Sequence, residues 1–265
     1  MSIYEDTFLA VYCIVVAFIL GSVFGSFLNC VSDRIIAHEK WWTGRSKCDA
    51  CGHILGVLDL FPVFSYLLLK GKCRYCGTRL SKTYVCSEAL LGILFVIMVA
   101  LHGTLDLTLL RDLGLVTVLY GLSLSDLKSY EIPDGFILFG IVWWILFSFS
   151  LQGLMSGFVI AASVLVISLI TEKVLKKEAM GGGDIKLFFV VGLYLGMLGS
   201  LFNLILACLI GLVFVVGMKK NKIPFGPSIS IATYIFLLYG NGFINWYMHL
   251  IGMCGIEYEE IIVRD

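Results

Sequence analysis

The chain has 265 residues, of which 59% are hydrophobic and only 14% are charged, and its formal net charge at pH 7 is zero. A soluble domain cannot bury so much apolar surface, so the composition excludes an ordinary soluble globular protein. No nucleic-acid partner is expected.

Apolar stretches of about 20 residues, the length that a helix needs to cross a bilayer, recur along the chain. We therefore predict an all-α, polytopic membrane protein with about eight transmembrane helices. The first span has no basic leading segment and no small-residue cleavage site, so we interpret it as an anchor rather than a signal peptide. The predicted spans are residues 7–32, 83–102, 107–125, 135–151, 154–174, 185–200, 201–218 and 228–250.

Basic residues set the predicted orientation. Seventeen of the nineteen Lys and Arg residues fall in segments that the eight-span arrangement places on one side of the membrane. Basic residues beside spans stay cytoplasmic, so that side is predicted to be the cytosol and both termini to lie outside it. The predicted parts are a first transmembrane helix (residues 1–32), a cytosolic loop domain (33–82), a transmembrane bundle (83–250) and an extracytoplasmic tail (251–265).

Two Cys-x-x-Cys pairs stand in the loop domain, Cys48-Asp-Ala-Cys51 and Cys73-Arg-Tyr-Cys76, separated by 21 residues and each followed by a glycine. Four thiolates at such a spacing favour a tetrahedral Zn²⁺ site with a structural role. The alternative is two reduced or redox-active pairs, but the cytosol disfavours disulfides. A loop domain with so small a core would also gain folding free energy from the metal.

Two aspartates lie at the predicted cytosolic border. Asp126 closes the third span, and Asp184 opens the sixth span after the glycine run 181–183. A carboxylate at a membrane border is costly, and a pair at one level suggests chemistry with two carboxyl groups. Asp184 has a simpler alternative as a helix N-cap, whereas Asp126 near a helix C-terminus has none. Asp134 is interpreted as the N-cap of the fourth span.

The glycine run at 181–183 is not followed by the Lys-Ser or Lys-Thr of a phosphate-binding loop. Residues without a Cβ atom would let another segment approach the backbone beside Asp184. The alternative is a flexible hinge between two spans.

These motifs together resemble the type IV prepilin peptidases, which are membrane aspartic proteases. The resemblance covers nearly the whole chain and rests on five stretches in order: Gly25-Ser-Phe-Leu-Asn29, the two Cys pairs, residues 126–134, residues 180–187 and Pro224-Phe-Gly-Pro227. It implies an endopeptidase of the bacterial inner membrane that removes the leader of prepilins or pseudopilins at the cytosolic border. It also implies methylation of the new N-terminus by S-adenosylmethionine.

Residue roles follow from this resemblance. It implies that Asp126 and Asp184 are the catalytic pair and that the four cysteines of the two pairs bind the metal. The residues it suggests for methyl transfer are Gly25, Asn29, Glu88 and Gly92. The expected partners are prepilin or pseudopilin substrates and membrane lipid, and the sequence leaves the oligomeric state open.

In the predicted mechanism one carboxylate takes a proton from water while the other, protonated carboxyl group supports the oxyanion. A helix N-terminus favours a charged carboxylate and a helix C-terminus favours a neutral carboxyl group. Asp184 is therefore predicted to begin as the base and Asp126 as the acid.

A cation or proton transporter or channel with a zinc-binding docking loop is the alternative function, because membrane acids also serve transport. The position of both acids at one border favours the peptidase.

Overall fold

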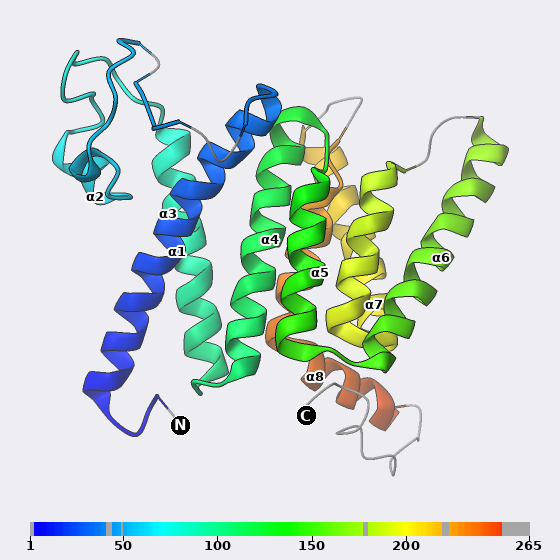
Figure 1. Cartoon of the computed structure of the whole chain (residues 1–265). Helices are drawn as coiled ribbons and strands as arrows, with labels where there is room; N and C mark the ends of the chain where they lie inside the picture. The colour runs from blue at the N-terminus through cyan, green and yellow to red at the C-terminus, as the bar shows by residue number, and fades with distance from the viewer. Residues whose placement is uncertain (1–2, 41–43, 49, 177–179, 219–222, 251–265) are drawn as a thin grey trace. The chain divides into compact units, whose positions relative to one another are not determined.

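The structure is a computed structural model that describes residues 3–40, 44–48, 50–176, 180–218 and 223–250. The predicted tail at 251–265 lies outside the described residues. Within them every long element is a helix, and β-pairing is limited to two isolated bridges, as the predicted all-α class requires (Figure 1). The chain divides into two compact units, Met1–Leu109 and Leu110–Asp265.

The first unit is built on two long helices that pack side by side, α1 (Thr7–Ile36) and α3 (Lys82–His102). The Asp6 side chain accepts a hydrogen bond from the amide of Phe8 at the start of α1. The Ser81 hydroxyl does the same for Thr83 at the start of α3, so both helices begin at capping residues of the expected type. The segment between them carries the short helices η1 (Val57–Asp59) and α2 (Phe64–Leu68).

Small residues allow α1 and α3 to approach closely. A Cβ atom on Gly21 would lie 2.7 Å from the carbonyl oxygen of Leu91 and 2.8 Å from the Cα atom of Gly92. One helix turn later, a Cβ atom on Gly25 would lie 3.0 Å from the Cα atom of Glu88. Backbones approach this closely where glycines recur every four residues along a membrane helix, which provides the van der Waals contact that holds such helices together.

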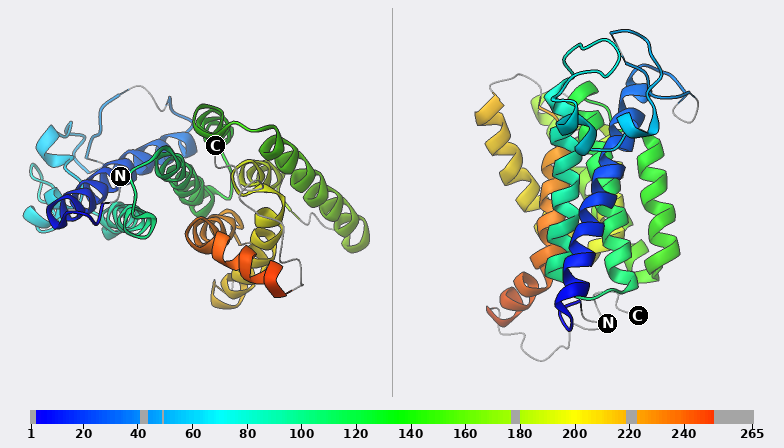
Figure 2. Two further views of the ribbon diagram at one scale, coloured as in Figure 1. Left: turned by 90° about the horizontal axis from the view of Figure 1, so that it is seen from below. Right: turned by 90° about the vertical axis from the view of Figure 1, so that its left-hand side faces the viewer.

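Within the described residues the second unit contains five helices, and α7 packs against α5, α6 and α8 (Figure 2). Their bounds are α4 (Leu107–Ser129), α5 (Asp134–Ser148), α6 (Leu151–Leu175), α7 (Gly182–Met218) and α8 (Gly226–Leu250). The first half of α7 forms the core of this unit, since Leu187, Phe188, Val190 and Val191 are fully buried. Its Tyr194 hydroxyl donates a buried hydrogen bond of 2.9 Å to the carbonyl of Gly140 in α5.

Helix α7 is interrupted at Gly196, whose φ of 67° and ψ of −176° are not helical. The sequence prediction of two spans, 185–200 and 201–218, placed this boundary after residue 200, and that position is wrong. A left-handed φ favours glycine, so the break falls at a residue without a Cβ atom. Asp184 near the start of α7 lies within range of the charge of Asp126, and Gly226 at the start of α8 donates a hydrogen bond to Asp126. The chain between them therefore leaves the neighbourhood of Asp126 and returns to it.

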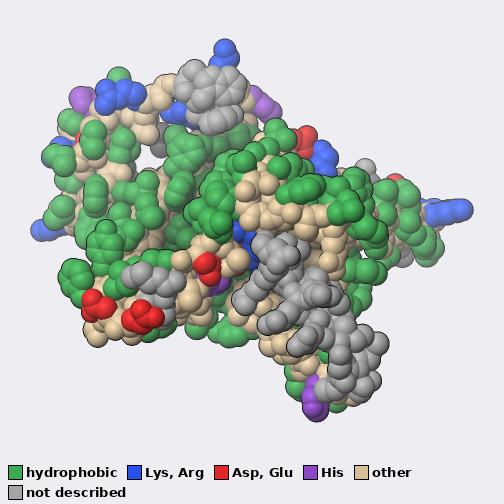
Figure 3. All heavy atoms as spheres, turned by 60° about the horizontal axis from the view of Figure 1, so that its bottom comes forward, with side chains coloured by type: hydrophobic (Ala, Val, Ile, Leu, Met, Phe, Trp, Pro, Cys, Tyr) green, Lys and Arg blue, Asp and Glu red, His purple; other side chains and the backbone are tan. Residues whose placement is uncertain are grey.

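Within the described residues, six helices are long and apolar enough to span a membrane: α1, α3, α4, α6, α7 and α8. The chain is therefore a multi-pass membrane protein. Helix α5 is apolar but has only 15 residues, while α7 contains two of the predicted spans. Each of the eight predicted spans thus overlaps a helix or one part of α7, although their boundaries differ by a few residues. Figure 3 shows hydrophobic side chains over much of the visible surface and charged side chains in a few places.

Candidate active site and metal centre

Asp126 lies in the last turn of α4 and is 5% exposed. Its Oδ2 atom accepts a buried hydrogen bond of 2.8 Å from the backbone N–H of Gly226, the first residue of α8. A Cβ atom on Gly226 would lie 2.7 Å from the same oxygen. The glycine therefore allows an amide of α8 to reach the carboxyl group of α4.

Asp184 is the third residue of α7 and is half-buried. Its carboxyl group is hydrogen-bonded to the amide of Gly181, and its own amide donates to the Gly181 carbonyl over 3.1 Å. Asp184 is thus not the N-cap residue that the simpler interpretation proposed. It lies inside the first turn, and its side chain reaches back to the residue before the helix.

The two carboxyl groups are close enough for their charges to interact. They come from different helices, α4 and α7, within one compact unit. When two carboxyl groups lie close together in a partly buried site, one can be ionised and the other protonated. The first can accept a proton from a water molecule while the second donates a proton.

The helix ends do not assign these roles. The prediction that Asp184 is the base and Asp126 the acid used only the helix on which each residue lies. The structure brings the N-terminus of a third helix, α8, to Asp126. A helix N-terminus carries partial positive charge, so both carboxyl groups now lie at such an end and the two are no longer distinguished by this argument.

Asp134 takes no part in this arrangement. It is the first residue of α5, and Pro133 occupies the N-cap position without a side-chain cap, so the predicted N-cap is one residue too late. The Asp134 carboxylate is exposed and pairs with Lys186 Nζ over 2.6 Å. This ion pair connects the start of α5 with the first turn of α7.

One glycine of the run before Asp184 is required for close packing. A Cβ atom on Gly183 would lie 2.8 Å from the Cβ atom of Ile132 in the loop between α4 and α5, whereas one on Gly182 would meet nothing within 4 Å. The loop that follows Asp126 therefore packs against the backbone next to Asp184, which helps bring the two aspartates together.

The two Cys-x-x-Cys pairs form matching turns in the first unit. In each turn the amide of the first cysteine donates to a carbonyl five residues later, from Cys48 to His53 over 2.9 Å and from Cys73 to Thr78 over 2.8 Å. The glycine after each second cysteine has a left-handed φ, 69° at Gly52 and 71° at Gly77. The glycines noted in the sequence are thus required by the turn.

The four sulfur atoms of Cys48, Cys51, Cys73 and Cys76 lie within 4.8 Å of one another. The Cys48 and Cys76 sulfur atoms are 3.9 Å apart. A tetrahedral ion bound at about 2.3 Å by each thiolate separates its sulfur atoms by roughly 3.8 Å, so the cluster fits a metal of that kind. Hydrogen bonding with Thr78 lowers the pKa of Cys76 to about 6, whereas burial and the neighbouring sulfur atoms of Cys48 and Cys76 raise the pKa of Cys51 to about 11.

His53, the histidine that follows the first cysteine pair, stacks on Tyr75 with ring centroids 3.6 Å apart. The group of possible ligands within the described residues contains the four cysteines and no histidine. A closed four-cysteine site is therefore the arrangement that the structure supports.

The four positions suggested for methyl transfer lie along the contact between α1 and α3. Asn29 is buried and donates hydrogen bonds to the Gly25 carbonyl and the Ser87 hydroxyl. The Glu88 carboxylate accepts from the amide of Val63, and a Cβ atom on Gly92 would lie 2.6 Å from the Ser22 hydroxyl. These contacts are made within the protein, and they do not outline a place for a methyl donor. The methyl-transfer role of the four residues stays a prediction.

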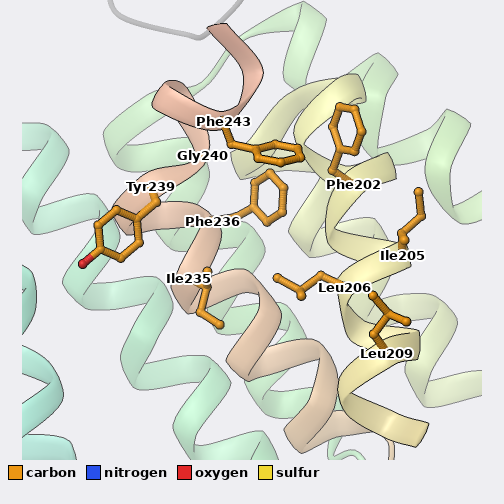
Figure 4. Close-up of a pocket in the computed structure, with 9 residues that line it drawn as sticks. All are labelled: Phe202, Ile205, Leu206, Leu209, Ile235, Phe236, Tyr239, Gly240 and Phe243. Atoms are coloured by element: carbon orange, nitrogen blue, oxygen red, sulfur yellow. The ribbon is translucent and has the colours of Figure 1, made fainter. Parts of the chain in front are cut away.

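An apolar cavity of about 340 Å³ lies between the second half of α7 and α8. Figure 4 shows its side chains extending from the two helices, with the Tyr239 hydroxyl directed away from the others. Phe202, Phe236 and Phe243 contribute aromatic rings to its wall. Apart from the Tyr239 hydroxyl, the residues that line the cavity are apolar.

Sequence reasoning missed the amide of Gly226. The stretch Pro224-Phe-Gly-Pro227 was noted only as a match to a family, without a role for any of its residues. The signal was present as a glycine followed by a proline at the start of a span, where proline is tolerated and glycine lets the backbone approach another group.

Comparison with known proteins gives matches over both compact units. Residues 19–102 match the bacterial peptidase A24 N-terminal domain, and residues 113–216 match the type IV leader peptidase family. The interval between these matches contains the boundary between the compact units after Leu109. No solved structure matches the chain.

Similar proteins cover most of this chain and most of their own length. A prepilin leader peptidase/N-methyltransferase of Aeromonas salmonicida is 31% identical over 276 residues, which cover 88% of this chain and 93% of that protein. A protein of the same name from Bacillus subtilis is 30% identical, and the match covers 89% of this chain and 98% of that protein. Another from Neisseria gonorrhoeae is 29% identical, and the match covers 91% of this chain and 96% of that protein.

Proposed function

The chain belongs to the type IV leader peptidase family, and on that premise we propose that Asp126 and Asp184 cut the leader from a type IV prepilin or pseudopilin. The protein is a membrane prepilin peptidase and N-methyltransferase, as its relatives are named. The observation that carries the catalytic assignment is that the carboxyl groups of Asp126 in α4 and Asp184 in α7 are close enough for their charges to interact, while the α8 N-terminus donates to Asp126.

The proposed reaction needs one water molecule and no covalent intermediate. The ionised carboxylate removes a proton from water as the water oxygen bonds to the scissile carbonyl carbon. The protonated carboxyl group gives its proton to the carbonyl oxygen, so the tetrahedral intermediate is neutral at that atom. When the C–N bond breaks, the leaving amine receives the proton taken from water, and one hydroxyl of the tetrahedral intermediate returns its proton to the other carboxylate. The new carboxyl group is released and the pair returns to its starting state.

The site of cleavage follows from the proposed topology. Basic residues accumulate on the side of the membrane where Asp126 and Asp184 lie, which supports the cytosolic border of the bacterial inner membrane and termini on the opposite side. A prepilin whose hydrophobic helix packs among the spans would present its leader to water at that border.

We also propose that the cysteine cluster holds Zn²⁺ with a structural role. The ion would be bound by Cys48, Cys51, Cys73 and Cys76 and would leave no position open for substrate. S-adenosylmethionine would supply the methyl group for the new N-terminus, as the names of the relatives imply.

The catalytic assignment is tested with detergent-purified protein and a prepilin, with and without S-adenosylmethionine, and products weighed by mass spectrometry. Asp126→Asn and Asp184→Asn are each expected to abolish leader removal while the protein remains folded. Asp134→Asn is the matched control, since this carboxylate is exposed and outside the pair. Retained cleavage in either variant of the pair would refute the assignment, and altered ion flux with retained cleavage would favour transport.

A further inference from the structure

The first unit exposes apolar side chains outside its membrane-spanning helices. Six residues of η1, α2 and their link form this apolar patch: Val57, Leu58, Phe61, Phe64, Leu67 and Leu68. The side chains of Val57, Leu58 and Leu68 are 80%, 75% and 82% exposed. Exposed apolar residues on the long helices are explained by lipid contact, but six exposed apolar side chains within residues 57–68 of a loop require a partner of their own.

The stretch of chain that forms the patch contains a single charged residue. Asp59 is the one charged residue between Leu55 and Leu69 in the sequence. Its carboxylate is turned toward the rest of the loop, where it accepts hydrogen bonds from Arg74 over 2.7 Å and from the Tyr75 hydroxyl over 3.0 Å. The patch surface is therefore made of aliphatic and aromatic side chains.

The patch is attached to α3 near the start of that helix. The amide of Val63, in the middle of the patch, donates a 2.9 Å hydrogen bond to the carboxylate of Glu88. Glu88 lies six residues after Lys82, where α3 begins, which is about 9 Å along a helix. Figure 1 accordingly shows α2 beside the end of α3 that begins at Lys82. The patch is therefore joined to a candidate membrane-spanning helix within two turns of the start of that helix.

Basic residues follow the patch directly. Lys70 and Lys72 come next in the chain and are exposed, and the exposed Lys82 begins α3. An apolar segment bordered by lysines is the composition of segments that lie in a membrane surface, since lysines attract anionic lipid headgroups while apolar side chains enter the acyl boundary.

We propose that the apolar patch is inserted in the bilayer leaflet at the start of α3 and holds the metal-binding loop against an anionic membrane surface. The two cysteine turns are then carried on a segment fixed at two places, by the Val63–Glu88 hydrogen bond and by lipid. This inference concerns the loop alone and does not depend on the catalytic assignment.

Photo-crosslinking tests the partner directly. The full chain carries p-benzoylphenylalanine in place of Leu58 or, in a second variant, of Leu68, and is reconstituted in vesicles of phosphatidylglycerol and phosphatidylethanolamine. The matched control carries the same group in place of Lys47, which is exposed in the same loop but lies outside the patch. After irradiation, mass spectrometry is expected to find several-fold more lipid adduct at Leu58 and Leu68 than at Lys47. Adducts with α4–α8 or a second copy, or no excess over Lys47, would overturn the proposal.

Hydroxyl-radical footprinting repeats the test on the unmodified chain. Phe61 and Phe64 are each 47% exposed and Tyr75 is 48% exposed, so water alone would reach the three rings similarly. In the vesicles, oxidation of both phenylalanines, normalised to the unfolded chain, is expected to fall several-fold below that of Tyr75. Equal oxidation of the three rings would contradict the proposal even if the crosslinking variants failed to insert.

Discussion

The backbone N–H of Gly226 donates a hydrogen bond to Oδ2 of Asp126 over 2.8 Å, although 100 residues separate them in the chain. This contact fixes the start of α8 to the end of α4 and leaves the other carboxylate oxygen, Oδ1, without a hydrogen-bond partner among the described residues. Catalysis by a carboxyl pair depends on orientation, so the contact is suited to orienting Asp126 for the reaction proposed above.

Gly226→Ala is expected to lower the rate of leader cleavage about a hundredfold. The added Cβ atom would lie 2.7 Å from Asp126 Oδ2 and would displace that carboxyl group. A displacement of about 1 Å of a catalytic group has an effect of this size. The measurement is kcat and KM for prepilin cleavage, with the loss expected in kcat. Gly242→Ala is the matched control in the same helix, since a Cβ atom there would meet nothing within 4 Å. Unchanged kcat in Gly226→Ala would show that the contact does not position Asp126.

Cys73→Ser is expected to remove the bound metal and to destabilise the loop, because Cys73 is a buried member of the cluster and the metal contributes folding free energy. Elemental analysis of the purified protein measures the metal, and limited proteolysis measures the loop. Cys86→Ser is the control, since Cys86 is exposed and outside the cluster. Equal metal content in the two variants would contradict a four-cysteine site.

Two substitutions of Glu88 distinguish a role as hydrogen-bond acceptor from a role of its charge in methyl transfer. If its function is to accept the hydrogen bond from Val63, Glu88→Gln retains an acceptor and keeps methylation, whereas Glu88→Ala loses it. If the charge acts on the methyl donor, both variants lose methylation. Mass spectrometry of products with S-adenosylmethionine measures methylation and cleavage together, and the structure leads us to expect that Glu88→Gln methylates. Loss of methylation in Glu88→Gln with cleavage retained would contradict this expectation.

Asn203 in α7 donates a hydrogen bond of 3.2 Å to the Thr233 hydroxyl in α8, and both side chains are fully buried. Replacing Asn203 by Ala is expected to lower the free energy of unfolding by about 0.6 to 1.7 kcal/mol, the range for hydrogen bonds between membrane helices. Unfolding in mixed micelles measures the change. Thr233→Val and the double variant complete a cycle, and strictly additive effects would show that the pair is not coupled.

Local patterns in the sequence predicted much of the architecture. The apolar spans were identified because the length of a bilayer-crossing helix is fixed by the membrane. The cysteine turns were recognisable because their geometry is contained in a few consecutive residues. The boundary at Gly196 was misplaced, since a single glycine inside a long apolar run gives no stronger signal than the other glycines around it. The N-cap of α5 was misplaced by one residue, because proline and aspartate both occur at helix starts.

By itself, the sequence determined which segments enter the membrane, which side of it carries the basic residues, and that four thiols are available to one ion. Only the tertiary structure decided that Asp126 faces an amide of α8, that Asp184 approaches it, and that an apolar patch is tied to α3 at the depth of Glu88. The reason is physical: hydropathy and turn geometry act between near neighbours in the chain, whereas these contacts depend on how separate helices pack.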